Sequence, residues 1–330
     1  MEKKFTILVI SFLLVSTFLF SAGRVEDATT SYPTKNITIV IPAGQGGAND
    51  VMARVMLASK GNKVKNQPVI VVNKPGGNEV VGAVYVAESK PDGYNLLMGW
   101  GGSTTTFARY VSDLPFDTFN DFVPIIGTAS FSNCLAVPYD SPFNTLEELV
   151  AYAKENPGKL RWTYSNINSM HYLIGLDFFN KAGIDLTEVI NSEGGAAARN
   201  LVAGNSVDVG IFATFLINGF EDKMKALAIC DDKRDPIFND VPLFSEAGYD
   251  VANLSECKII AAPKGTPAEI INLLYSEFKS MLDEPSTKEA YAKQGYTIRA
   301  WNPEECMEAT LNLDKMYEQI VKDFNIKPVN

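Results

Sequence analysis

The chain has 330 residues, of which 46% are hydrophobic and 21% charged, a balance typical of a globular protein large enough for two hydrophobic cores. Its formal net charge of −10 disfavours nucleic acid and anionic lipid as partners, although an anion site built from backbone N–H groups needs no net positive charge. With one histidine and no Cys-x-x-Cys pair, neither a zinc site nor any other cofactor is expected.

The N-terminus has the pattern of a secretory signal peptide. Lys3 and Lys4 precede the apolar run 5–20, and the small residues 21–23 end it. This run is short for a bilayer span of about 20 residues, which disfavours the alternative of a permanent membrane anchor. No cysteine follows it to carry a lipid. We therefore expect residues 1–23 to be removed on export, residues 24–35 to form a leader, and the mature protein to be periplasmic or otherwise extracytoplasmic.

After the leader, short β-branched and apolar runs alternate with amphipathic segments, a pattern typical of an α/β protein with a parallel sheet. The predicted strands are Ile37–Ile41, Val69–Val72, Asn95–Met98, Phe122–Gly127, Asn133–Val137, Leu160–Tyr164, Thr187–Ile190, Val207–Ile211, Ala226–Ile229 and Leu254–Ala262. The predicted helices are 50–60, 79–89, one from about Thr105, Leu146–Glu155, Met170–Ala182, 196–203, 267–283 and 303–324.

This order of elements predicts two domains. The chain leaves a first αβ set, builds a second and returns, so residues 36–128 and 258–330 form one domain and residues 129–257 the other. Two crossings between domains form a hinge, and a ligand is expected in the cleft between them.

The turn after the first predicted strand is the most informative stretch. Pro42 ends the strand, and Gly44, Gly46 and Gly47 permit positive φ and close backbone approach before a helix begins. N–H groups and the helix dipole converge there, which favours an anion and, in our interpretation, a carboxylate. A dinucleotide turn is one alternative, but its third glycine position is Asn49 here, and no acidic residue follows the second strand. A bare structural turn is the other.

Three further polar or glycine-rich turns also follow predicted strands. In an open α/β sheet ligands bind outside the carboxyl ends of the strands, so all four turns are expected to face one cleft, two from each domain. For any single turn, an ordinary solvent loop is the alternative. The four turns are Ala43–Asn49, Gly99–Thr106, Ser165–Ser169 and Asn191–Gly195.

Ordered motifs run from Tyr32 nearly to the C-terminus. They are YPTKNITIVIPAGQGGANDVMAR (32–54), VVNKPGG (71–77), KPDGYNLLMG (90–99), DFVP (121–124), NPGKL (156–160), SEGGAAARNLVAGNSVDVG (192–210), DVPLFSEAGY (240–249) and APKGTPAEII (262–271). By these motifs the chain resembles the extracytoplasmic receptors of tripartite tricarboxylate transporters, also called Bug-type receptors. The resemblance implies a two-domain type II periplasmic binding fold, and a monomer is expected. It would close on a small organic carboxylate and deliver it to a permease of one large and one small integral membrane subunit.

The resemblance also implies the residues that bind the ligand. Backbone N–H groups of the first turn would hold a carboxylate, the second turn would form another wall, and the second domain would contact the distal end partly through ordered water. The residues so implied are Pro42, Ala43, Gly46, Gly47 and Asp50 in the first turn, Gly101, Gly102 and Ser103 in the second turn, and Ser165, Asn166, Asn168, Glu193, Gly194 and Gly195 in the second domain.

Three positions bear on the identity of the ligand. Phe212 stands where many family members have an acidic or small polar residue, which disfavours a ligand with an ammonium group. Trp100 replaces a commonly small residue, and both aromatic side chains are either pocket walls that stack on the ligand or core residues. Glu193 would repel a second carboxylate unless it turns outward or accepts a hydrogen bond from a ligand hydroxyl.

Other single residues have structural interpretations. His171 has no matched nucleophile and is expected at the cleft rim or against the first turn of its helix, rather than as a catalytic base. Asp208 is expected to act as a cap or to fix a loop as an acceptor, with a ligand-binding group as the alternative. The four cysteines are expected to be buried thiols, with disulfides as the alternative. They are Cys134, Cys230, Cys257 and Cys306.

The sequence therefore predicts a binding protein and not an enzyme. A ligand-sensing receptor of the same fold and a cleft enzyme acting on a carboxylate remain the alternatives.

Overall fold

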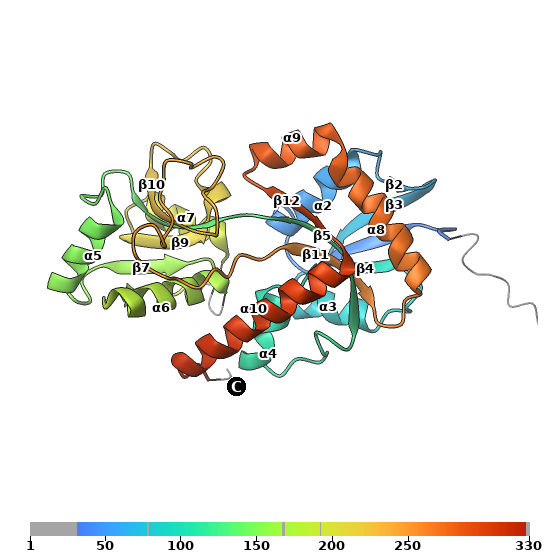
Figure 1. Ribbon diagram of the computed structural model, residues 1–330, viewed down its shortest axis with the longest axis horizontal. Coiled ribbons are helices and arrows are strands. Elements are labelled where there is room, and N and C mark those ends of the chain that lie inside the picture. The colour runs from blue at the N-terminus through green and yellow to red at the C-terminus, as the bar shows by residue number, and fades with distance from the viewer. Residues whose placement is uncertain (1–31, 78, 167–168, 192, 328–330) are drawn as a thin grey trace, which may run out of the picture.

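The computed structural model describes residues 32–77, 79–166, 169–191 and 193–327, which form two lobes, each built on its own β-sheet (Figure 1). The expected signal peptide, residues 1–23, lies outside the described residues. Within the described part of the chain, no helix has both the length and the apolar character needed to cross a membrane.

The first lobe contains a seven-stranded sheet with the order β12-β5-β11-β4-β1-β3-β2. Its strands are β1 (Ile37–Ile41), β2 (Lys63–Val64), β3 (Gln67–Asn73), β4 (Asn95–Trp100), β5 (Phe122–Ser130), β11 (Lys258–Pro263) and β12 (Thr297–Trp301). β3, β1 and β4 pair in parallel, but β11 pairs antiparallel with both β4 and β5, and β12 pairs antiparallel with β5. The expected parallel sheet is therefore found in only part of this lobe. The reason is that β11 returns from the other lobe instead of following a helical crossover.

Helices cover both faces of this sheet. In β1, Ile39 and Ile41 contribute to one buried cluster and Val40 to another, as the alternation of a strand requires. One face carries α2 (Ala48–Ala58), α8 (Ala268–Asp283) and α9 (Pro285–Lys293). The other carries α3 (Val80–Ala87) and the start of α10 (Pro303–Asp323). η1 (Ser103–Phe107) contacts α3 and α10, and α4 (Ala108–Val111) follows η1.

The second lobe contains a five-stranded sheet with the order β10-β6-β9-β7-β8. Its strands are β6 (Asn133–Pro138), β7 (Arg161–Tyr164), β8 (Thr187–Glu188), β9 (Val209–Ala213) and β10 (Met224–Cys230). α5 (Leu146–Glu155) and α6 (Met170–Ala182) pack on one side, and α7 (Gly195–Ala203) packs on the other. The short helix η2 (Thr214–Leu216) follows β9.

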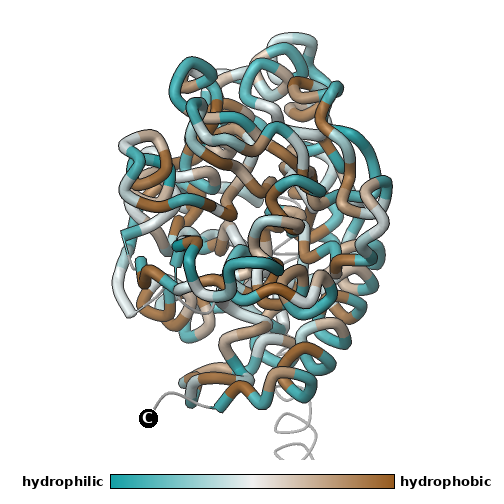
Figure 2. Tube along the Cα trace, turned by 90° about the vertical axis from the view of Figure 1, so that its left-hand side faces the viewer, coloured by the Kyte–Doolittle hydropathy of each residue, from teal (hydrophilic) through white to brown (hydrophobic). Residues whose placement is uncertain are grey.

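Two segments join the lobes, one from β5 to β6 and one from β10 back to β11 (Figure 1). Polar segments lie mostly on the outside of the trace and apolar ones inside (Figure 2). All four cysteines are buried and free, which confirms the prediction of buried thiols.

Candidate functional site

The first turn joins β1 to α2 and is open to solvent. Gly44 to Gly47 are exposed, and a Cβ added to Gly44 or Gly46 would meet no atom within 4 Å. Gly46 has φ +83°, which other residues rarely adopt, and Gly47 is the N-cap of α2 without a side-chain cap. Backbone N–H groups at such an uncapped helix start attract an anion. An anion site at this turn therefore stays a prediction.

The buried Asp50 side chain stabilises the turn between β1 and α2 through hydrogen bonds. Asp50 is 2% exposed, and its carboxylate accepts hydrogen bonds from the Gly46 N–H at 2.9 Å, the Asn73 amide at 3.0 Å and the Arg54 Nε at 3.0 Å. Burial raises the pKa of this carboxyl, but the bonds from Arg54, Gly46 and Asn73 outweigh burial and hold the pKa below its usual range. Asp50 thus shapes the turn.

The second turn contacts the first helix directly. A Cβ on Gly99 would lie 2.7 Å from the Asn49 amide nitrogen, and Gly99 has φ +110°. The Asn49 side-chain oxygen is buried and has no hydrogen-bond partner among the described residues. Gly101 and Gly102 are buried, and the π-helix η1 begins at Ser103, where the sequence predicts an ordinary helix from about Thr105.

The two turns of the second lobe are held together by one amide. The Asn191 side chain is 6% exposed, and its nitrogen donates to the carbonyls of Tyr164, Ser165 and Gly194 at 2.8 to 3.0 Å. Its oxygen accepts from the Glu193 N–H at 3.1 Å. A single side chain therefore fixes both turns of this lobe.

The start of α7 resembles the start of α2. Gly194, the N-cap, has φ +91° and no side-chain cap, and a Cβ there would meet nothing within 4 Å. Its N–H donates to the Asn166 side-chain oxygen at 3.1 Å. Gly195 packs against Ser165, and Glu193 is exposed. Asn168 lies outside the described residues.

The two aromatic residues singled out in the sequence are core residues. Trp100 and Phe212 are both fully buried. The Trp100 indole N–H donates to the Thr118 carbonyl at 2.8 Å, and the Phe212 ring lies in the cluster beneath α7 with Val202 and Cys134. The alternative in which these rings line a pocket is therefore wrong for their side chains, because each points to the sheet face that a helix covers.

His171 and Asp208 have structural contacts. Asp208 accepts from the Arg161 backbone N–H at 2.8 Å, which confirms that it fixes a loop. His171, in the first turn of α6, is 6% exposed, and its Nε2 lies 2.9 Å from the Asn133 side-chain oxygen. Its Nδ1 is buried without a partner among the described residues. Burial lowers the pKa of His171 from 6.5 to about 4.

This shift predicts a pH dependence of stability. Between pH 6.5 and 4 the unfolded chain binds a proton at His171 that the folded chain does not, so the free energy of unfolding should fall as the pH falls through this window. The contribution of this group is about 3 kcal/mol. Urea unfolding of the wild type and of His171→Gln at pH 7, 5.5 and 4 measures it. The variant should lose less stability than the wild type on acidification, and parallel losses would contradict the prediction.

Among the described residues, no group of three or more His, Cys, Asp or Glu side chains could hold a metal ion.

Comparison with known proteins adds independent evidence. Residues 52–326 match the family model described as tripartite tricarboxylate transporter family receptor. The chain is 33% identical over 275 residues to a Cupriavidus necator protein named UPF0065 protein in gbd 5'region, covering 83% of this chain and 82% of that one. It is 28% identical to the protein BugT of Bordetella pertussis, covering 86% and 88%.

Solved structures show the same fold. The periplasmic binding protein BugD matches with a TM-score of 0.78 and 26% identity, over 90% of this chain and 100% of that one. At 24% identity, MatC from Rhodopseudomonas palustris with bound malate has a TM-score of 0.77 over 88% of this chain and 100% of that one. An adipate-bound protein of R. palustris, also 24% identical, reaches 0.80 over 91% and 100%.

Proposed function

Because the chain belongs to the tripartite tricarboxylate transporter receptor family, we propose that it captures a small organic carboxylate between its two lobes. We propose further that it delivers this ligand to a permease of one large and one small membrane subunit. The family and the two-domain periplasmic binding fold predicted from the motifs are confirmed. Members of this family are solute-binding receptors, and the family implies an extracytoplasmic location. Removal of residues 1–23 on export and a monomeric state are part of the proposal.

One observation carries the ligand class. Each lobe presents a helix start that has no side-chain cap and has a positive-φ glycine at which a Cβ would meet no atom within 4 Å. This glycine is Gly46, just before the N-cap Gly47, in one lobe and the N-cap Gly194 in the other. The Gly46 and Gly194 N–H groups already donate to Asp50 and Asn166, so the other N–H groups of these helix starts are the proposed donors to an anionic group, which the helix dipole also favours. A carboxylate needs no cation in such a site, which suits a protein with a net charge of −10.

The proposed contacts follow the sequence prediction with one change. Backbone groups of the two turns in each lobe remain the proposed binding groups, and Asp50 supports the first turn. Trp100 and Phe212 contribute no side-chain contact because both rings are buried. The remaining proposed residues are Pro42, Ala43, Gly46, Gly47, Gly101, Gly102, Ser103, Ser165, Asn166, Asn168, Glu193, Gly194 and Gly195.

The burial of Phe212 also removes the argument against a ligand with an ammonium group. The Phe212 ring faces the core beneath α7. The acidic residue that other family members have at this position is therefore no guide to the charge of the ligand pocket in this protein. Glu193 is exposed beside the α7 start and is the acid whose position suits an ammonium group. We still propose a carboxylate ligand without an essential ammonium group. The comparison of carboxylates with amino acids in a thermal-shift screen tests this choice.

A thermal-shift screen tests the ligand class. Malate, adipate and citrate are compared with aspartate, glutamate and phosphate, each at rising concentration. A ligand at 100 times its Kd adds about 2.7 kcal/mol to the free energy of unfolding, so we expect a rise in Tm of about 5 °C for at least one of the carboxylates. Mass spectrometry of the ligand retained after purification identifies candidates outside this set. Stabilisation by amino acids alone would contradict the proposed ligand class.

A further inference from the structure

In the first crossing, which joins β5 to β6, the chain passes from the first lobe to the second within one residue. The Ser130 hydroxyl accepts a hydrogen bond from Arg299 Nε of β12 at 2.8 Å, so this residue is bound to the first lobe. The carbonyl of Ser132 accepts from the Thr214 N–H at 3.0 Å, so this residue is bound to the second lobe. Phe131 is the residue between these two anchors. Its ring contacts aromatic residues of both lobes, Phe215 and Tyr296.

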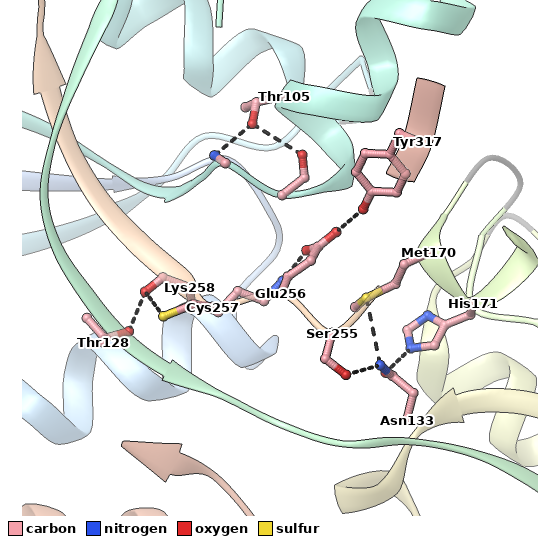
Figure 3. A network of polar contacts seen from close by, with 12 residues as sticks. Thr105, Thr128, Asn133, Met170, His171, Ser255, Glu256, Cys257, Lys258 and Tyr317 are labelled. Atoms are coloured by element: carbon pink, nitrogen blue, oxygen red, sulfur yellow. Dashed lines mark hydrogen bonds and ion pairs between the residues drawn. The ribbon is translucent and has the colours of Figure 1, made fainter. Parts of the chain in front are cut away.

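The second crossing is bound to the second lobe as far as Ser255. The Asn133 amide at the start of β6 donates to the Ser255 hydroxyl at 3.2 Å (Figure 3). That hydroxyl donates to the Cys230 carbonyl at 3.3 Å. The Asn133 oxygen is in turn held by His171 of α6. These contacts join Ser255 to β6, β10 and α6, which all belong to the second lobe.

The next residue, Glu256, is bound to the first lobe. It is 4% exposed, and its carboxylate accepts hydrogen bonds from the Tyr317 hydroxyl of α10 at 3.0 Å and from Lys258 Nζ of β11 at 2.7 Å (Figure 3). A buried carboxylate of this kind holds its position firmly, because leaving it unpaired is costly. The second turn packs closely against the Glu256 carboxylate, because a Cβ added to Gly102 would lie only 2.5 Å from Glu256 Oε2.

From these contacts we propose that the lobes rotate about an axis through Phe131 and the peptide between Ser255 and Glu256, and that Tyr317 and Glu256 are positioning residues that confine the bending to this peptide. Hinges are a few residues that absorb a change in φ and ψ, and here firmly bound neighbours leave only these positions to bend. The position of the hinge does not depend on the proposed function. Only the role of the rotation, which is to close the lobes on a ligand, rests on that function. Through Gly102, the anchor also connects the hinge to the second turn.

Removing one hydroxyl tests the anchor. Spin labels on the exposed positions Lys63→Cys in the first lobe and Lys154→Cys in the second report the distribution of distances between the lobes. The protein without these two substitutions, treated with the same label, shows how much label the four buried native cysteines take up. Without ligand, Tyr317→Phe should broaden this distribution, because Glu256 is then less firmly bound and the bending spreads along the crossing. Tyr32→Phe is the matched control. It also removes a buried hydroxyl of the first lobe, which donates to the Gly93 carbonyl at 2.6 Å, and among the described residues its ring contacts Tyr94 and no residue of either crossing.

The controls separate a hinge from general loosening. Both variants lose stability, but only Tyr317→Phe should broaden the distribution, and equal distributions in the two variants would overturn the proposal. Ser255→Ala removes the anchor on the other side and should also broaden it. If Tyr317→Phe does not fold, the result for Ser255→Ala decides. A separate arm adds malate to the wild type. A failure of malate to narrow the distribution counts against malate as the ligand, whereas the ligand-free variants alone decide where the molecule bends.

Discussion

Replacing Gly46 and Gly47 together by valine is expected to abolish binding of the carboxylate that gives the largest shift in the thermal screen. Two valine side chains would fill the space over the start of α2, where a Cβ on Gly46 now meets no atom within 4 Å. Valine also disfavours the φ of +83° at Gly46, at a cost of about 1–2 kcal/mol. We expect the affinity to fall by well over tenfold, which is about 1.4 kcal/mol. Isothermal titration calorimetry measures it.

Gly248→Val is the matched control for backbone strain. Gly248 has φ +87° and open space around its Cβ position, but it lies in a different turn of the second lobe, outside the proposed site. This variant should lose stability and keep its affinity. If the double variant at the first turn binds within tenfold of the wild type, the turn is a structural element only, and the first half of the proposed site is wrong.

Replacing Asn191 by alanine is expected to cost about 3 kcal/mol of unfolding free energy. Asn191 is 6% exposed, and its amide donates to the carbonyls of Tyr164, Ser165 and Gly194. Its removal takes this donor from the carbonyls of the buried residues Tyr164 and Ser165. Ligand affinity should fall as well, because the two turns of the second lobe are no longer held together. Urea unfolding and calorimetry measure the two effects.

Asn156→Ala controls for the loss of an amide as such. The Asn156 side chain makes a single exposed bond, to the Tyr152 carbonyl at 3.0 Å at the end of α5, so its removal should change stability little. If Asn191→Ala is as stable as this control and binds ligand normally, the turns do not depend on the Asn191 amide.

Local sequence patterns predicted the elements whose signal lies within a few residues. The helices Leu146–Glu155 and Met170–Ala182 have the predicted bounds, because Thr145 and Ser169 cap them and their apolar residues follow the helical period. The strand Ile37–Ile41 also has its predicted bounds. In contrast, β12 was not predicted, because its pairing with β5 joins segments far apart in the sequence.

Some features of the candidate site can also be predicted from local sequence, whereas others are visible only in the folded structure. The residues alone indicate glycine turns after strands, because glycines and helix-start residues are local features, and the ordered motifs indicate the family by resemblance. The ligand class stays a proposal. Only the tertiary structure shows what covers each face of a strand, and so places Trp100 and Phe212 in the core. It also brings together partners distant in sequence, such as Asn191 with Tyr164 and Glu256 with Tyr317. Hydrogen bonds between such segments form only when the chain is folded, so no local pattern in the sequence encodes them.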